Sequence, residues 1–251
     1  MLGLGGGVFL VPFLNAVLGF PLNMASGVGL MTVIATSSVV ARGASNGIVN
    51  LRLGMVLQIA AAAGGYFGGS VARHIPERAL QAMFSVVTGT IAAIMLSRLE
   101  RRNVILDRSV EPGRFGGRYF EEESGQEIVY RTKRLPAALV VSLVAGSISG
   151  LLGLGGGILQ VPALNAWCGV PLRAAAVTSS IMIGITAAAS APLYYVHGDI
   201  VPPLAAGAVV GTFMGSQVGL WFGGRARAKW LKVLMAGVLG FVSITYLVKA
   251  I

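Results

Sequence analysis

The stretch GLGGGVFLVPFLNAVLGFPLNMA at residues 3–25 returns as GLGGGILQVPALNAWCGVPLRAA at residues 153–175. Fifteen residues are identical over the 38 aligned positions 3–40 and 153–190, among them two prolines and an asparagine. Chance similarity between apolar segments does not account for proline and asparagine at matched positions. The repeat therefore indicates an internal duplication, and the chain consists of two homologous halves.

Charged residues are scarce and unevenly placed. Only 28 of the 251 residues are charged, against about a quarter in soluble domains, and the mean hydropathy is +0.79. Sixteen of these charges lie between residues 98 and 134, which leaves 12 for the other 214 positions. Such a chain cannot cover a water-facing surface, which excludes a soluble enzyme or a nucleic-acid-binding domain. The net charge of +10 falls on the linker and on short loops between apolar runs, which is typical of membrane topology.

Long uncharged stretches predict an all-α polytopic membrane protein. A helix needs roughly 20 apolar residues to cross a ~30 Å hydrocarbon core. Five stretches fit one helix each: 53–72, 79–97, 172–196, 202–222 and 230–250. The stretches 1–41 and 135–172 are too long for one helix and contain Gly and Pro, so each is subdivided. The predicted domains are a first transmembrane repeat at 1–97, a polar linker at 98–134 and a second transmembrane repeat at 135–251.

Two further predictions concern the linker and the start of the first repeat. Residues 117–130 contain two short β-prone strings around Ser124-Gly125, which predicts a β-hairpin within a solvated cap. In the second half a helix at about 135–152 precedes GLGGG, whereas in the first half GLGGG begins at Gly3. The repeat therefore predicts that the native chain begins earlier, with about sixteen to eighteen more residues of an apolar helix.

The basic residues of the loops predict the orientation in the membrane. If the Gly-rich segments (about 5–18 and 155–169) cross, the halves are inverted and 16 of the 19 Lys and Arg residues share one side. If these segments are re-entrant, the halves are parallel and the division is 12 to 7. The positive-inside rule favours the first arrangement, and inverted repeats are common in secondary transporters. We therefore expect inverted repeats with broken Gly-rich helices in the plasma membrane, with the 98–134 linker in the cytoplasm.

The duplicated Gly-rich motifs are the predicted substrate site. A helix interrupted inside a membrane offers free N–H groups and a positive dipole end to an anion, although close helix packing also explains glycine. The amides of the motifs fit either pairing with this free backbone or contact with substrate. Hydroxyls on the next helix fit either an oxyanion or their own helix carbonyls. The candidate substrate-binding residues are Gly5, Gly6, Gly7, Asn15, Gly155, Gly156, Gly157, Gln160, Asn165, Thr178, Ser179 and Ser180.

The sequence gives little support for a metal site, a cofactor site or a catalytic site. One cysteine (Cys168), two histidines and nine acidic residues leave no disulfide and little for a metal site. The dinucleotide pattern G-x-G-x-x-G fails because Val8 and Ile158 occupy its third glycine position. We expect no enzyme activity, no cofactor and no metal. The expected partners are the lipid bilayer and a small anionic substrate, and the oligomeric state stays open.

The motif G-x-G-G-G-x-x-x-V-P-x-L-N, present in both halves, resembles that of the TauE/SafE family of membrane transporters. The resemblance covers nearly the whole chain, including the polar central linker. It implies export of a small anion, sulfite or an organosulfonate by association with the family, but says little about the substrate. A passive small-anion channel and a membrane protein without transport activity stay open as alternatives.

Overall fold

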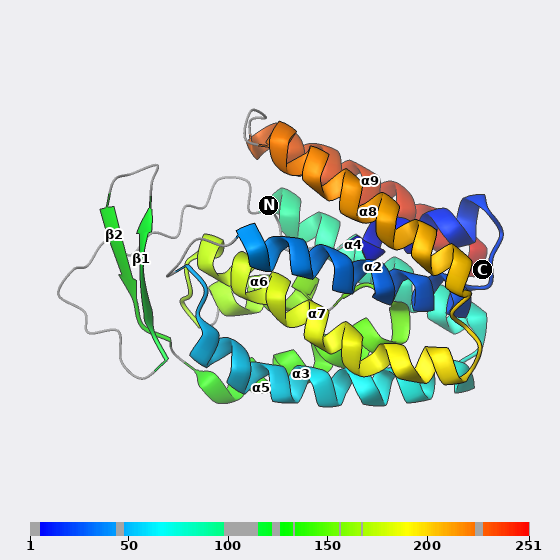
Figure 1. Ribbon diagram of the computed structural model, residues 1–251, viewed down its shortest axis with the longest axis horizontal. Coiled ribbons are helices and arrows are strands. Elements are labelled where there is room, and N and C mark those ends of the chain that lie inside the picture. The colour runs from blue at the N-terminus through cyan, green and yellow to red at the C-terminus, as the bar shows by residue number, and fades with distance from the viewer. Residues whose placement is uncertain are drawn as a thin grey trace.

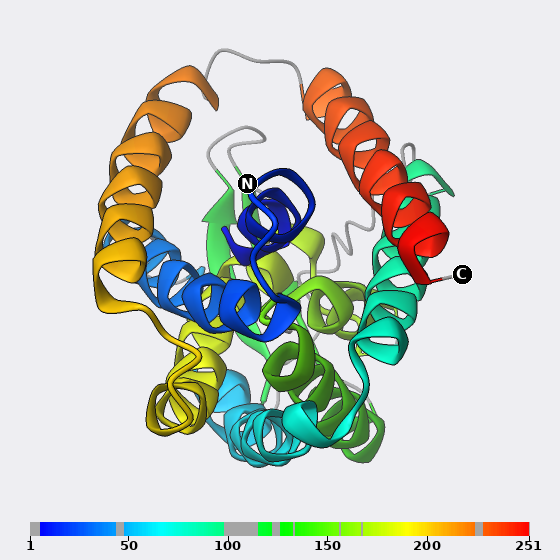
Figure 2. The ribbon, with the colours of Figure 1, turned by 90° about the vertical axis from the view of Figure 1, so that its right-hand side faces the viewer.

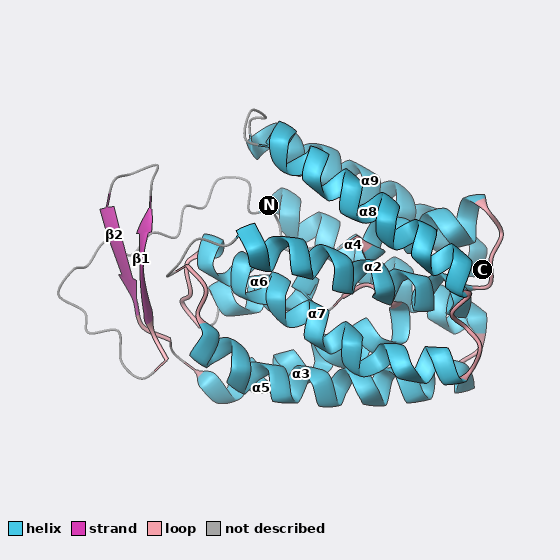
Figure 3. Ribbon diagram, viewed as in Figure 1, coloured by secondary structure: helices cyan, strands magenta, loops and turns pink. Residues whose placement is uncertain are grey.

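The computed structural model describes residues 6–43, 48–97, 115–121, 126–132, 134–155, 157–166, 168–223 and 228–250. The described part is mostly helical, with one small sheet (Figure 3). The first half contains α1 (Gly7–Pro12), a π-helical turn (Phe13–Val17), α2 (Leu22–Gly43), α3 (Leu51–Val71), a 3-10 turn (Ala72–His74) and α4 (Glu77–Ser97). Strands β1 (Gly117–Glu121) and β2 (Gln126–Tyr130) follow. The second half contains α5 (Leu135–Leu152), α6 (Gly157–Ala166), α7 (Leu172–Val196), α8 (Pro202–Gly223) and α9 (Ala228–Ala250).

The long helices have the dimensions and surface of membrane spans. Among the described residues, four helices are long and apolar enough to cross: Leu22–Arg42, Leu51–His74, Leu135–Leu152 and Ala174–Val196. Helices α4, α8 and α9 have 21, 22 and 23 residues, about 32–35 Å at 1.5 Å per residue. Ile59, Val86 and Phe241 are more than 60% exposed on the outside, which suits contact with lipid. The chain is a multi-pass membrane protein, and its long helices lie within two residues of the five stretches predicted as single helices.

The two halves pack against each other through several helix pairs. Helix α2 packs on α7, α4 on α9, α3 on α7 and α8 on α2. Helices α2 and α7 are antiparallel, because Gly27 near the start of α2 faces Tyr194 near the end of α7. Further along α2, Ser37 Oγ donates to the carbonyl of Ile181, in the first half of α7. Helices from equivalent positions of the repeat thus run in opposite directions (Figure 1).

Helices α4 and α9 repeat this relationship. The ring of Phe84 stacks on that of Tyr246 at a centroid distance of 4.7 Å, whereas Gly89, later in α4, faces Ser243, earlier in α9. The hydroxyls of Ser85 and Ser243 each donate to the main-chain carbonyl of the other, both at 2.8 Å. This second antiparallel pair of equivalent helices means that both halves contribute matched elements to the interface.

Glycines bring α3 and α5 into main-chain contact. Gly64 lies against the carbonyl of Leu143, and Gly150 lies against the carbonyl of Gly65. A side chain at either glycine would overlap the neighbouring helix, so these residues permit the close approach typical of membrane helices. For this pair, packing alone explains the glycines.

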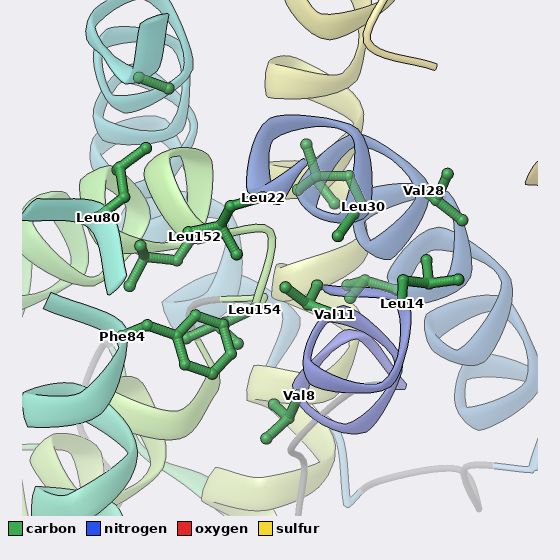
Figure 4. Close-up of a cluster of buried hydrophobic side chains, with 14 of the residues drawn as sticks. Val8, Val11, Leu14, Leu22, Val28, Leu30, Leu80, Phe84, Leu152 and Leu154 are labelled. Atoms are coloured by element: carbon green, nitrogen blue, oxygen red, sulfur yellow. The ribbon is translucent and has the colours of Figure 1, made fainter. Parts of the chain in front are cut away.

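The main apolar core lies where α1, α2, α4 and the end of α5 meet, and it extends to α7 and α9 (Figure 4). Its labelled members are Val8, Val11, Leu14, Leu22, Val28, Leu30, Leu80, Phe84, Leu152 and Leu154. Viewed along the bundle, α8 and α9 lie on opposite sides of α1 (Figure 2). The start of the first Gly-rich segment therefore lies between two helices of the second half.

A β-hairpin stands at one end of the helix bundle (Figure 1). Strands β1 and β2 pair antiparallel, with Gly117 opposite Tyr130 and Glu121 opposite Gln126. These are the residues for which the sequence predicts a hairpin. The rest of the 98–134 linker, apart from residues 115–116, 131, 132 and 134, lies outside the described residues.

Candidate functional site

Both Gly-rich motifs lie beside the middle of the antiparallel helices α2 and α7. A Cβ built on Gly7 would lie 3.0 Å from Val33, and one built on Gly155 would lie 3.0 Å from Val33 and 3.7 Å from Ile183. Val33 and Ile183 occupy equivalent positions of the repeat, each near the midpoint of its helix. The motifs therefore meet deep in the bundle, far from both ends of the long helices.

Threonine side chains surround the first motif. The N–H of Gly6 donates to Thr36 Oγ1 at 3.5 Å, and a Cβ on Gly6 would lie 2.9 Å from the methyl group of Thr212 on α8. The hydroxyls of Thr32, Thr36 and Thr212 donate to carbonyls of their own helices at 2.6–3.0 Å. These hydroxyls thus have protein partners. Gly5, the other candidate of this motif, lies outside the described residues.

The second motif joins two helices through left-handed glycines. Helix α5 ends at Leu152, Gly153 and Gly155 have φ of 68° and 70°, and α6 begins at Gly157. Residues with a side chain avoid this backbone conformation, so glycine is needed at both positions. Helix α6 has ten residues, about 15 Å, or half of a hydrocarbon core. Gly156 lies outside the described residues.

Gln160 on α6 is a candidate whose buried amide is incompletely paired. Its side chain is 1% exposed, and Ser179 Oγ of α7 donates to Gln160 Oε1 at 3.3 Å. Gln160 Nε2 has no hydrogen-bond partner among the described residues. A buried N–H group without an acceptor costs about 1–3 kcal/mol, so this amide is suited to an additional acceptor. The structure thus brings Gln160 and Ser179 together, as neighbours of the second motif.

The two asparagines of the motifs make the same bond in each half. Asn15 Nδ2 donates to the carbonyl of Phe20 at 2.8 Å, and Asn165 Nδ2 donates to the carbonyl of Val170 at 3.0 Å. Both side chains are buried, and both bonds close the turn that leads into the next long helix. Both Nδ2 atoms thus pair with the backbone, which is one of the two uses expected for these amides, whereas Asn15 Oδ1 has no partner among the described residues. It places both asparagines at the far end of their segments from the glycines.

The hydroxyl cluster on α7, formed by Thr178, Ser179 and Ser180, is buried, and its members bond to different partners. Thr178 Oγ1 accepts from the main-chain N–H of Asn50 at 3.1 Å, and Ser180 Oγ donates to the carbonyl of Ala176 at 2.8 Å. Sequence reasoning missed Asn50, although an asparagine directly before an apolar run is a signal for a helix N-cap. It also missed Gln58, whose buried amide bonds Thr186 on α7. No local signal pointed to that pair.

Ionisable groups lie toward the ends of the helices. Arg73 Nε lies 4.0 Å from Asp199 Oδ2, which links the α3–α4 connection to the α7–α8 connection. Among the described residues, no three His, Cys, Asp or Glu side chains come together in a way that would hold a metal ion. The chemistry available at the motifs is therefore hydrogen bonding by backbone, hydroxyl and amide groups.

Comparisons with known proteins agree with the membrane architecture. The family described as "Sulfite exporter TauE/SafE" matches residues 1–246. The chain is 24% identical over 248 residues to the "Probable membrane transporter protein YunE" of Bacillus subtilis (strain 168), an alignment that covers 95% of this chain and 88% of the relative. No solved structure matches the chain significantly.

Proposed function

Because this chain belongs to the TauE/SafE sulfite exporter family of membrane transporters, we propose that it is a secondary transporter that exports sulfite or an organosulfonate. The observation on which we base the binding site is the buried amide of Gln160, whose Nε2 has no acceptor among the described residues. The oxygens of a sulfite or sulfonate group supply such acceptors, and hydrogen bonds to charged groups are stronger than neutral ones.

The surroundings of Gln160 support an anion site at this place. Ser179 contributes a hydroxyl beside the amide, and the first turn of α6 carries the positive end of a helix dipole. The motifs lie at mid-length of α2 and α7, and secondary transporters commonly bind substrate near the bilayer midplane at the interface of their repeats. We propose that the substrate is held here by neutral donors, with Gly155 and Gly157 allowing its close approach.

We also propose inverted halves with the linker in the cytoplasm. The antiparallel packing of α2 on α7 and of α4 on α9 supports inversion, since these are equivalent helices of the repeat. The bonds of the Asn50 side chain to the hairpin support an arrangement with the α2–α3 connection and the linker on one side. Both arrangements of the basic residues share that grouping, and the antiparallel helix pairs favour the one with 16 of 19 on one face, which the positive-inside rule assigns to the cytoplasm.

Flux measurements in proteoliposomes test this function. The purified protein is supplied with sulfite, sulfoacetate, thiosulfate or sulfate under an imposed proton or sodium gradient. Saturable, gradient-coupled flux is expected for a carrier, whereas single conductance events in planar bilayers would establish a channel instead. Absence of flux for every anion would contradict the proposal.

The variant Gln160→Leu tests the site itself, because leucine stands at the equivalent position 10 of the first half. Loss of a hydrogen bond to a charged substrate, about 1.5–3 kcal/mol, predicts a KM raised roughly 10- to 150-fold. The matched control is Gln81→Leu on α4, where the amide is also buried but bonds Glu77. A KM that responds equally to both changes would contradict a site at Gln160.

A further inference from the structure

We propose that the β-hairpin is a gate on the second half, and that Asn50 is the joint connecting this gate to α7. The gating role rests on the proposed transport function. The hairpin and Asn50 lie outside the Gly-rich motifs. In this role they control access to the site.

One face of the hairpin is buried in a cluster formed by residues of both halves. The side chains of Tyr119, Ile128 and Tyr130 are at most 4% exposed. They share one apolar cluster with residues at the end of α6, in the following connection and in the adjoining helices, including Leu164, Cys168, Val170, Ala174 and Ala175. A cap that was merely solvated would leave such side chains in water. The hairpin therefore belongs to the apolar cluster around the α6–α7 connection, where the carbonyl of Arg131 lies 3.6 Å from a Cβ built on Gly169.

Asn50 joins three separate elements through hydrogen bonds. Its Nδ2 donates to the carbonyl of Phe115 at 2.9 Å and to the hydroxyl oxygen of Tyr130 at 3.1 Å. Its Oδ1 accepts from the N–H of Leu53 at 3.1 Å and so caps α3. Its main-chain N–H donates to Thr178 Oγ1 at 3.1 Å. The hairpin, the first half and α7 are thus connected through one buried residue.

This connection runs directly toward the proposed substrate site. Thr178 precedes Ser179, and Ser179 bonds Gln160. In this proposal, substrate enters the second half from the hairpin end and passes the apolar cluster to which the hairpin belongs. Since a hydrogen bond between neutral groups contributes little net free energy, the Tyr130–Asn50 bond can break and reform in each cycle. Asn50 is accordingly a positioning residue, and opening of the hairpin frees the start of α7.

The chain contains its own reporter for this movement, because Cys168 is its only cysteine and is fully buried beneath the hairpin. Tyr130→Phe removes one hydroxyl and keeps the ring. In inside-out vesicles we expect this variant to raise the labelling rate of Cys168 by a membrane-impermeant maleimide at least fivefold. The control is Tyr195→Phe, at an exposed tyrosine on α7, which should leave the rate unchanged. Equal labelling rates for Tyr130→Phe and the unaltered chain would overturn the proposal.

Transport kinetics separate a gate from a structural anchor. Thr178→Val keeps the side-chain size but removes the acceptor for Asn50, so it should change the maximal rate in the same direction as Tyr130→Phe. For Tyr130→Phe, which does not touch the substrate site, we expect the maximal rate to change at least twofold with KM unaltered. Faster labelling without any change in rate would show an anchor and overturn the gate. Labelling needs no substrate, so it measures opening even if the anion panel fails.

Discussion

Gly7 of the first Gly-rich motif lies directly against the main-chain carbonyl oxygen of Gly153, the first residue of the second motif. No side chain separates them, so α1 and the α5–α6 connection touch through their backbones. Gly153 also lies against the main chain of Ser26 on α2. The duplicated motifs thus form one junction between the halves. A larger side chain at these glycines would overlap main-chain atoms.

Substitution at this junction should destabilise the protein. Gly153→Ala forces a side chain into a left-handed conformation and into the main chain of Ser26, for a loss of about 2–4 kcal/mol. Gly198→Ala is the control for conformation alone, since its φ is 76° but no described atom lies within 4 Å of an added Cβ. Its expected loss is about 1–2 kcal/mol. Unfolding in mixed micelles measures the difference, and equal losses would contradict the close approach.

Asn15→Ala and Asn165→Ala should lower stability by similar amounts. Each removes the donor to a carbonyl in the turn before a long helix, and a buried acceptor left without its partner costs about 1–3 kcal/mol. Thermal unfolding in detergent provides the measurement, with Asn23→Ala on α2 as a half-buried control. A loss of stability in only one of the two variants would contradict the equivalence of the two turns.

The ion pair between Arg73 and Asp199 should contribute little to stability. Its shortest separation is 4.0 Å and the arginine side chain is half exposed, so solvent screens the attraction. A double-mutant cycle of Arg73→Ala and Asp199→Asn is expected to give a coupling of about 0.5 kcal/mol or less. A coupling above about 2 kcal/mol would mean that this link is a principal clamp between the halves.

Cys168 should react slowly and with a shifted pH profile. Burial raises the pKa of its thiol above the ordinary value of 9.0, because the thiolate loses hydration. Since the thiolate is the reactive form, the labelling rate at neutral pH should be low and should rise with pH to an inflection above 9.0. A stopped-flow pH series with a small maleimide measures this profile. An inflection below 9.0 would indicate an exposed or charge-stabilised thiol.

Local patterns predicted the helices well but not their polar contacts. The uncharged stretches located α3, α4, α7, α8 and α9 to within two residues, because span length and apolar composition are properties of contiguous sequence. The hairpin at residues 117–130 followed from a turn signal between β-prone strings. Asn15 and Asn165 could be recognised as polar residues in apolar runs. Their actual partners depend on how the chain turns after each short helix.

By itself, the sequence determined that this is a duplicated, helical membrane protein, since charge scarcity, span length and the repeated motif are all readable along the chain. Only the tertiary structure decided that α2 and α7 run antiparallel, that Gln160 meets Ser179, and that Asn50 connects the hairpin to Thr178. Asn50 and Thr178 are 128 positions apart. The physical reason is that such contacts arise when distant helices pack, and no periodicity within a single helix encodes which neighbour it will face.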